Sequence, residues 1–348
     1  MPLLTVSGLC KTFGQRTFST TKALRQESPT KNIAQSSGGV VAVSNVSFHV
    51  EEGEILVIMG SSGCGKSTMI RCLNRLIEPS SGSVLIGGDD VTKASPAKLL
   101  EIRRHRIAMV FQSFALLPHR SVVDNVALGL KFGGIGAKQR QDRARTALAK
   151  VGLEKWADFY PDSLSGGMKQ RVGIARALVT SADLLLMDEA FSALDAVVRK
   201  EMQDELLALQ RDMKRSVIFV THDMHEALRV GDRIIVMKEG RVVQCASGPE
   251  LVSRPADDYI AGFVKDVDRS RILTVGHAVK NATGQSAAAT NSDRTEHSVD
   301  SKTKLADVFG RFSASPVLSV INDDRAVIGT ITAEDVMRVL SSGNGRDA

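Results

Sequence analysis

The sequence predicts an α/β fold built on a mostly parallel sheet, and three observations support this prediction. Short apolar runs at residues 55–59, 107–111, 184–187 and 217–220 alternate with longer helical patterns, as a buried parallel sheet covered by helices requires. A glycine-rich segment, GSSGCGKST at residues 60–68, stands between the first of these runs and a helix-like stretch. At 348 residues, 43% of them hydrophobic, the chain can bury one large core and a smaller second one.

The sequence also excludes several classes of protein. No apolar run approaches the roughly 18 to 20 residues needed to span a bilayer, and the first residues lack the charged-then-apolar plan of a secretory signal. We therefore expect the chain to stay in the cytoplasm. The cysteines show no CxxC spacing and no cluster with histidine, so we expect reduced thiols rather than a disulfide framework or a structural zinc site.

The charge of the chain is uneven. Its net charge is +6, and residues 1–265 hold 35 Lys/Arg against 28 Asp/Glu, a net of +7. Such an excess suits a nucleotide, a nucleic acid or an acidic membrane surface and does not choose among them. The basic cluster at residues 103–106, RRHR, is interpreted equally well as a solvated surface.

Changes in composition predict the domain limits. Residues 1–265 form the first domain, which a polar insertion at residues 15–39 interrupts between two strand-like segments. Residues 266–300 are predicted to be a linker and remnant segment, within which residues 280–300 are low in large apolar residues, as a flexible linker is. Residues 301–342 form a small β-β-α module, and residues 343–348 a tail.

The segment at residues 60–68 fits the pattern GxxxxGK[ST] and is predicted to bind the phosphates of a nucleoside triphosphate. Its backbone amides and the start of the helix supply aligned dipoles, Lys66 supplies a charge for the β- and γ-phosphates, and Ser67 offers a hydroxyl to Mg²⁺. The predicted binding residues in this phosphate loop are Gly60, Ser61, Ser62, Gly63, Cys64, Gly65, Lys66, Ser67 and Thr68.

Two acids end the apolar strand at residues 184–187. Asp188 is a candidate for holding Mg²⁺ through water, and Glu189 is a candidate general base that polarises the attacking water. The alternative is that the pair caps the next helix, since Asp and Glu can accept hydrogen bonds from the first helical amides. The two acids alone do not decide between these interpretations.

The segment LSGGMKQ at residues 164–170 opens a predicted helix and offers small residues and free amides to a second anion. If this signature segment and the phosphate loop face apart, two chains meeting head to tail would each close the nucleotide site of the other. A dimer would then be part of the mechanism.

Three more segments complete a recognisable order. Gln112 ends one strand, Asp195 follows the acidic pair, and His222 ends another strand. With the phosphate loop, the acids and the signature segment, this order resembles the ATP-binding cassette (ABC) family over residues 3 to about 265. The resemblance implies ATP hydrolysis by a RecA-like core, an antiparallel β subdomain and an α-helical signature subdomain.

The resemblance also implies roles for individual residues. Glu189, His222 and Lys66 would be catalytic, and Gln112 would touch both Mg²⁺ and the transport partner. The Mg²⁺ ligands would be Ser67, Gln112 and Asp188. Asp195 would belong to the dimer-contacting D-loop and Phe13 would stack on adenine. The signature residues that act in trans would be Ser165, Gly166, Gly167 and Gln170.

Longer runs, among them LNRLIEPSSG, IAMVFQSFALLPH and LLLMDEAFSALD, are similar to the ATPase subunit of importers for glycine betaine, proline betaine and choline. Ala190, where most family members carry Pro, supports this subgroup. The resemblance implies a homodimer that binds ATP and Mg²⁺, acts in osmoprotection and binds no nucleic acid. It would lie at the cytoplasmic face of the inner membrane as a peripheral subunit, bound to a permease and indirectly to a solute-binding subunit.

Three alternatives remain beside that interpretation. The first is an importer of the same build for another small solute, such as an amino acid or a metal chelate. The second is a non-transport ABC ATPase acting on the ribosome or DNA, which is disfavoured because the chain has neither a second cassette nor a long coiled coil. The third is a P-loop kinase, in which the signature segment and His222 would have no role.

The C-terminal module resembles one cystathionine β-synthase type (CBS) repeat. Gly329, Thr332 and Asp335 match the pattern G-x-x-T-x-x-D, in which Thr332 and Asp335 would bind the phosphate and ribose of a regulatory adenine nucleotide. Only one repeat is recognisable, so such a site would need pairing between chains. A dimer-stabilising or vestigial module is the alternative.

Overall fold

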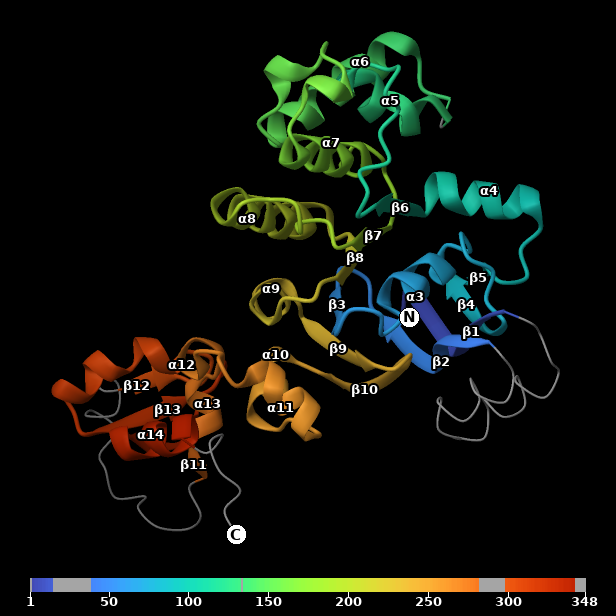
Figure 1. Cartoon of the computed structure of the whole chain (residues 1–348). Coiled ribbons are helices and arrows are strands. Elements are labelled where there is room, and N and C mark those ends of the chain that lie inside the picture. The colour runs from blue at the N-terminus through green and yellow to red at the C-terminus, as the bar shows by residue number, and fades with distance from the viewer. Residues whose placement is uncertain (1, 15–38, 133, 282–297, 342–348) are drawn as a thin grey trace. The chain divides into compact units, whose positions relative to one another are not determined.

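The computed structural model describes residues 2–14, 39–132, 134–281 and 298–341, and contacts divide the chain into two compact units, residues 1–245 and 246–348 (Figure 1). Residues 15–38 of the predicted polar insertion and the tail at residues 343–348 lie outside the described residues. Among the described helices, none is long and apolar enough to cross a membrane.

A six-stranded sheet forms the centre of the first unit, as the apolar runs predict. Its strand order is β10-β9-β3-β8-β7-β6, and the neighbours β9-β3, β3-β8, β8-β7 and β7-β6 are parallel. Every residue of β3, β7 and β8 is buried, which explains their continuous apolar runs. The strands are β3 Ile55–Gly60, β6 Ile107–Val110, β7 Leu184–Asp188, β8 Ser216–Val220, β9 Arg233–Lys238 and β10 Arg241–Ala246.

A second, antiparallel sheet has the order β2-β1-β4-β5 and confirms the expected antiparallel subdomain. The central strand β1 pairs with two partners at once, so Leu4 lies opposite both Val50 and Ile86. Its inward side chains share a hydrophobic core with the helix that follows the phosphate loop. The strands are β1 Leu4–Phe13, β2 Val40–Val50, β4 Ser81–Ile86 and β5 Asp89–Asp90.

The helices of the first unit fall into two groups. Helices α5, α6 and α7 pack on one another in a bundle of their own, joined to the sheet through β6 and β7 (Figure 1). This bundle confirms the expected helical subdomain. Its helices are α5 Val122–Phe132, α6 Ala137–Lys150 and α7 Gly166–Leu178, with short 3-10 turns at Glu154–Trp156 and Pro161–Ser163. The other helices are α3 Lys66–Leu73, α4 Pro96–His105, α8 Ala196–Met213 and α9 Met224–Val230.

The second unit contains a four-stranded sheet of order β11-β14-β13-β12. β13 and β14 are antiparallel and α14 follows them, which is the expected β-β-α order, while β12 runs parallel to β13. The elements are α10 Gly248–Ser253, α11 Asp258–Val264, α12 Arg269–Ile272, α13 Val275–Ala278, β11 Lys280–Asn281, β12 Ser298–Asp300, 3-10 turns Leu305–Asp307 and Phe309–Ser313, β13 Val317–Ile321, β14 Val327–Thr332 and α14 Ala333–Ser341.

This unit differs from the sequence expectation in one respect. The segment expected as linker and remnant, residues 266–300, contains α12, α13, β11 and β12. A few small or medium apolar side chains are enough to anchor it, because Leu273 and Val275 are fully buried and Val299 is 1% exposed. The domain limits and the resemblance to a CBS repeat stay predictions.

Candidate functional site

The phosphate loop connects the end of β3 to the start of α3. Lys66, the first residue of α3, is 4% exposed, and its ammonium donates hydrogen bonds to the carbonyl oxygens of Gly60 at 2.8 Å and Ser61 at 3.0 Å. The amine therefore lies across its own loop, and the loop backbone sets its position.

Two glycines of this loop are required by close backbone contacts. Gly60 has a φ of 149°, and a Cβ there would overlap the carbonyl oxygen of Met237 in β9. Gly65 has a φ of 102°, and a Cβ there would overlap the carbonyl oxygen of Ala42 in β2. Both positions need a residue without a side chain, because the loop is packed between strands of both sheets.

Asp188, the last residue of β7, faces α3. Its Oδ1 accepts a hydrogen bond from Ser67 Oγ at 2.7 Å, its Oδ2 accepts one from Arg71 Nη2 at 3.0 Å, and the side chain is fully buried. The carboxylate thus bonds to side chains of another element rather than to helical amides. This arrangement favours the ligand interpretation of Asp188 over the helix cap.

Glu189 stands where three segments of the chain meet. Its Oε2 accepts a hydrogen bond from Gln112 Nε2 at 2.9 Å, and its Oε1 lies 3.7 Å from His222 Nδ1. Its φ of 49° is a left-handed conformation that costs a non-glycine residue about 1 kcal/mol or more, and its backbone N–H bonds to Val220 across the sheet. The structure therefore brings together Gln112, Glu189 and His222.

The loop after Gln112 is fastened to the helical bundle. Phe114 and Ala115 both have a φ of 49°, and Arg176 of α7 donates to their carbonyl oxygens at 3.0 and 2.6 Å. Burial lowers the pKa of the Arg176 guanidinium from its usual value. Asn125 of α5, fully buried, holds the next part of the loop through the backbone of residues 117–121.

Sequence reasoning missed both fastening residues. Arg176 and Asn125 each stand within a helical pattern, where an arginine or an asparagine carries no motif of its own. Only the folded loop shows which carbonyl groups they bind.

The signature segment forms the first turn of α7. Ser165 caps the helix, because its Oγ accepts a hydrogen bond from the backbone N–H of Met168 at 3.3 Å. Ser165 and Gly166 are exposed and Gly167 is partly exposed, whereas Gln170 is 1% exposed, with neither of its amide atoms hydrogen bonded. The structure therefore does not bring Gln170 to the surface that the other signature residues form.

The remaining predicted residues have separate environments. Asp195 caps α8, since its Oδ1 accepts from the backbone N–H groups of Val197 and Val198, each at 3.1 Å. Phe13 is 43% exposed at the end of β1, with the ammonium of Lys11 4.9 Å from its ring centroid. Phe13 pairs with Val40 in β2, two residues from the contact that β2 makes with the phosphate loop.

In the second unit, Thr332 and Asp335 bind each other. Asp335 Oδ2 accepts hydrogen bonds from the backbone N–H of Thr332 at 3.1 Å and from its hydroxyl at 2.8 Å, and the Asp335 N–H returns one to the hydroxyl at 3.3 Å. This reciprocal pattern closes the start of α14 in the manner of a helix cap. A role in binding a nucleotide stays a prediction.

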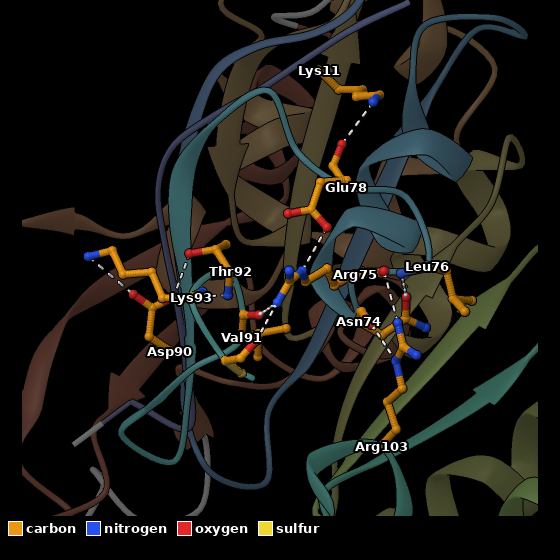
Figure 2. A network of polar contacts seen from close by, with 11 residues as sticks. Lys11, Asn74, Arg75, Leu76, Glu78, Asp90, Val91, Thr92, Lys93 and Arg103 are labelled. Atoms are coloured by element: carbon orange, nitrogen blue, oxygen red, sulfur yellow. Dashed lines mark hydrogen bonds and ion pairs between the residues drawn. The ribbon is translucent and has the colours of Figure 1, made fainter. Parts of the chain in front are cut away.

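A polar network holds the far end of α3 (Figure 2). Arg75, with a φ of 55°, bonds to Glu78 at 2.7 Å and to the carbonyl oxygens of Val91 and Ala94, while Arg103 of α4 bonds to the carbonyl oxygens of Asn74 and Arg75. The helix that starts at the phosphate loop is therefore anchored at its C-terminal end as well.

This network also bears on the basic cluster at residues 103–106. Arg103 belongs to the network, and Arg106 forms an ion pair with Asp183 at 2.7 Å. Two of the four basic residues in the cluster thus serve internal contacts, which favours a structural interpretation for them.

Comparisons with known proteins agree with this geometry. Residues 43–192 match the family model described as ABC transporter. The chain is 50% identical to the glycine betaine transport ATP-binding protein OpuAA of Bacillus subtilis over 80% of this chain and 66% of that protein. It is 44% identical to the glycine betaine/proline betaine transport system ATP-binding protein ProV of Escherichia coli, over 99% of this chain and 84% of that protein.

A solved structure agrees as well. A dimeric ATP-binding cassette in a post-hydrolysis state, bound to ADP and phosphate, superposes with a TM-score of 0.61 and 32% identity, covering 70% of this chain and 98% of that one. With the phosphate loop, the buried Asp188 and the meeting of Gln112, Glu189 and His222, these likenesses place the chain in the ABC transporter family of ATP-binding proteins.

Proposed function

We propose that this chain is the ATP-hydrolysing subunit of an importer for quaternary ammonium solutes such as glycine betaine, proline betaine and choline. The observation that carries the enzymatic part is the position of Glu189, whose carboxylate is held by Gln112 on one side and faces His222 on the other. The relatives named for glycine betaine transport support the solute class.

The proposed site divides the work of hydrolysis among its side chains. The phosphate loop amides and Lys66 bind the β- and γ-phosphates of ATP, and Glu189 accepts a proton from the attacking water. His222 donates a hydrogen bond to the transferred phosphoryl group, and Gln112 keeps the Glu189 carboxylate in place.

The residues beside the phosphate loop fit a magnesium ion. Ser67 Oγ and Asp188 Oδ1 lie 2.7 Å apart, and the side-chain oxygen of Gln112 is a third candidate donor. Mg²⁺ prefers oxygen ligands and is usually held by one or two protein oxygens together with phosphate and water. The ion, when bound, neutralises negative charge on the phosphate oxygens.

The proposed assembly is a homodimer on the cytoplasmic face of the inner membrane. The exposed Ser165 and Gly166 would face the γ-phosphate held by the partner chain, and the dimeric relative supports this arrangement. A permease would receive the force at the loop after Gln112, which Arg176 and Asn125 join to the helical bundle.

Solute selection is assigned to other subunits. Quaternary ammonium groups are held by faces of several aromatic rings, and the whole sequence has 1 Trp and 2 Tyr. Trp156 packs on Phe159 with ring centroids 4.9 Å apart, which supports a packing role within the bundle.

The test is purification of the tagged Glu189→Gln chain from its own membranes with ATP present, since this change should preserve ATP binding and block hydrolysis. We expect a permease and a solute-binding protein to co-purify, and the complex to hold radiolabelled glycine betaine or choline. The control is Glu201→Gln on the exposed surface of α8, which should leave hydrolysis intact.

Each other outcome removes a different part of the proposal. A permease complex that holds neither solute would keep the transport mechanism and discard the substrate class. Ribosomal or DNA-associated partners in place of a permease would overturn the transport function itself.

A further inference from the structure

The turn at residues 221–223, here called the His222 turn, is closed by the residue before the histidine. Thr221 Oγ1 accepts a hydrogen bond from the backbone N–H of Asp223 at 3.0 Å and donates one to Glu226 Oε2 at 2.5 Å. A hydroxyl has one proton, so donation to Glu226 orients its lone pairs toward Asp223. Thr221 and Glu226 are only 2% and 7% exposed, so the shape of the turn depends on the Glu226 carboxylate.

Arg199 of α8 joins this turn to the loop that leads into α8. Its Nη2 donates to the carbonyl oxygen of Leu194 at 3.0 Å, its Nε lies 3.6 Å from Glu226 Oε1, and its Nη1 lies 3.8 Å from Asp223 Oδ2. Gln203, one turn further along α8, donates to the same Glu226 oxygen at 3.3 Å. One guanidinium thus contacts both the entry to α8 and both acids beside His222.

The burial of Glu226 makes this contact more than a surface ion pair. Burial raises the pKa of the Glu226 carboxyl, while the hydrogen bond from Thr221 and the charge of Arg199 act in the opposite direction. A buried carboxylate is costly when its partner is removed, because an unpaired charge then remains inside the protein. The position of Glu226 therefore depends on Arg199.

The Arg199–Glu226 pair lies beside the reacting side chains. A cavity of about 40 Å³ adjoins the pair, Glu189, Ser192 and His222, which exceeds the roughly 10–15 Å³ that a cavity needs to hold one water molecule. His222 Nδ1 is 3.7 Å from Glu189 Oε1. A displacement of the His222 turn would change this distance directly.

We infer that Arg199 and Glu226 are positioning residues for His222. They hold the His222 turn at a fixed position relative to the start of α8. The inference rests on the proposed role of His222 in hydrolysis. It predicts an effect on kcat rather than on the KM for ATP, because the contacts described above for Lys66 and Phe13 involve neither residue.

The experiment measures kcat and KM for ATP on the full chain carrying Thr221→Val, Thr221→Ser or Glu226→Gln. Thr221→Val keeps the shape of the side chain and removes both hydrogen bonds, so we expect kcat to fall roughly tenfold with KM changed less than about twofold. Thr221→Ser restores the hydroxyl and should recover most of kcat. Glu226→Gln keeps an acceptor but loses the charge that Arg199 faces, so its kcat should lie between those two.

The chain offers a matched control. Arg229 of α9 forms an ion pair with Asp204 of α8 at 2.7 Å, so it joins the same two helices without contact to the His222 turn in the described structure. Arg229→Gln should therefore leave kcat unchanged. A loss of kcat with this variant that equals the loss with Glu226→Gln would show a general weakening of the α8–α9 packing and would overturn the inference.

A double-variant measurement separates this inference from the proposed function. If Glu226 acts through His222, adding Glu226→Gln to His222→Ala should lower kcat no further. An additional loss would contradict the inference, as would an unchanged kcat in Thr221→Val. Full activity of His222→Ala alone would instead overturn the proposed role of His222. If Thr221→Val fails to fold, Arg199→Lys takes its place, because it keeps the charge and removes the guanidinium that contacts Leu194. Its kcat should then fall while its KM for ATP changes little.

Discussion

The phosphate loop and the signature segment are both expected to bind phosphate, but they are built differently. The phosphate loop is surrounded by its own chain: Lys66 is 4% exposed, and Ser67 is bonded to Asp188, 121 residues away. The signature segment is capped by its own Ser165, and Gly166 is exposed. The phosphate loop is thus held by distant parts of its own chain, whereas the signature segment leaves Ser165 and Gly166 exposed.

The largest effect is expected from Lys66→Ala. Removing the ammonium that lies across the loop should weaken ATP binding on the order of 100-fold and abolish measurable hydrolysis, because we propose that its charge binds the β- and γ-phosphates. Calorimetric titration with ATP measures the affinity. The control is Lys93→Ala, which removes a side chain that is 83% exposed. An unchanged affinity for ATP in Lys66→Ala would contradict the proposal that the phosphate loop binds ATP through Lys66.

Gly166→Asp tests the signature segment. An acid in the first turn favours helix formation, so α7 should stay folded, but its charge repels a phosphate. If the signature acts as proposed, on the nucleotide of a second chain, ATP binding to one chain should be unchanged and hydrolysis should fall roughly tenfold or more. Light scattering with ATP reports the dimer, and ATPase assays report the rate.

Mixing the two variants separates a trans site from a cis site. A dimer of one Lys66→Ala chain and one Gly166→Asp chain keeps a single site with an intact phosphate loop and an intact signature. Hydrolysis should reappear in the mixture if the signature acts in trans. No recovery, with mixed dimers demonstrated, would mean that the two regions act within one chain.

A smaller effect is expected from the contact between the loop after Gln112 and α7, the helix that begins with the signature segment. Arg176→Gln frees the carbonyl groups of Phe114 and Ala115, whose left-handed backbones each cost about 1 kcal/mol. We expect faster amide hydrogen exchange in residues 113–117 and a several-fold lower ATPase rate. Adding Ala115→Gly to Arg176→Gln relieves the backbone strain at one residue and should restore part of the ATPase rate. Arg145→Gln, which removes an exposed ion pair with Asp158, is the control.

The smallest effect is expected in the second unit. Thr332→Val removes a cap whose partner is three residues away, so the unfolding free energy should fall by about 1 kcal/mol with no change in ATPase rate. Thermal unfolding with and without adenine nucleotides measures this, with Thr330→Val on the exposed side of β14 as control. Stabilisation by a nucleotide that Thr332→Val abolishes would show a ligand site where the structure has a helix cap.

The sequence by itself determined those strands and loops whose signal lies in residues close together along the chain. The apolar runs predict β3, β6, β7 and β8 because a strand buried on both faces needs apolar side chains throughout. The pattern GxxxxGK[ST] between a strand and a helix predicts the phosphate loop. The position of Asp188 and Glu189 directly after an apolar run makes them candidates for the Mg²⁺ ligand and the general base. Such signals are local, so the sequence shows them without knowledge of the tertiary structure.

Only the tertiary structure decided which distant side chains meet. Gln112 and Glu189 are 77 residues apart and are joined because β6 and β7 are neighbours in the sheet. Arg176 acquires its role from the path of the loop after Gln112, and the burial of Gln170 follows from how α7 packs. Strand order and helix packing arise from the whole hydrophobic core, so neither local spacing nor periodicity contains them.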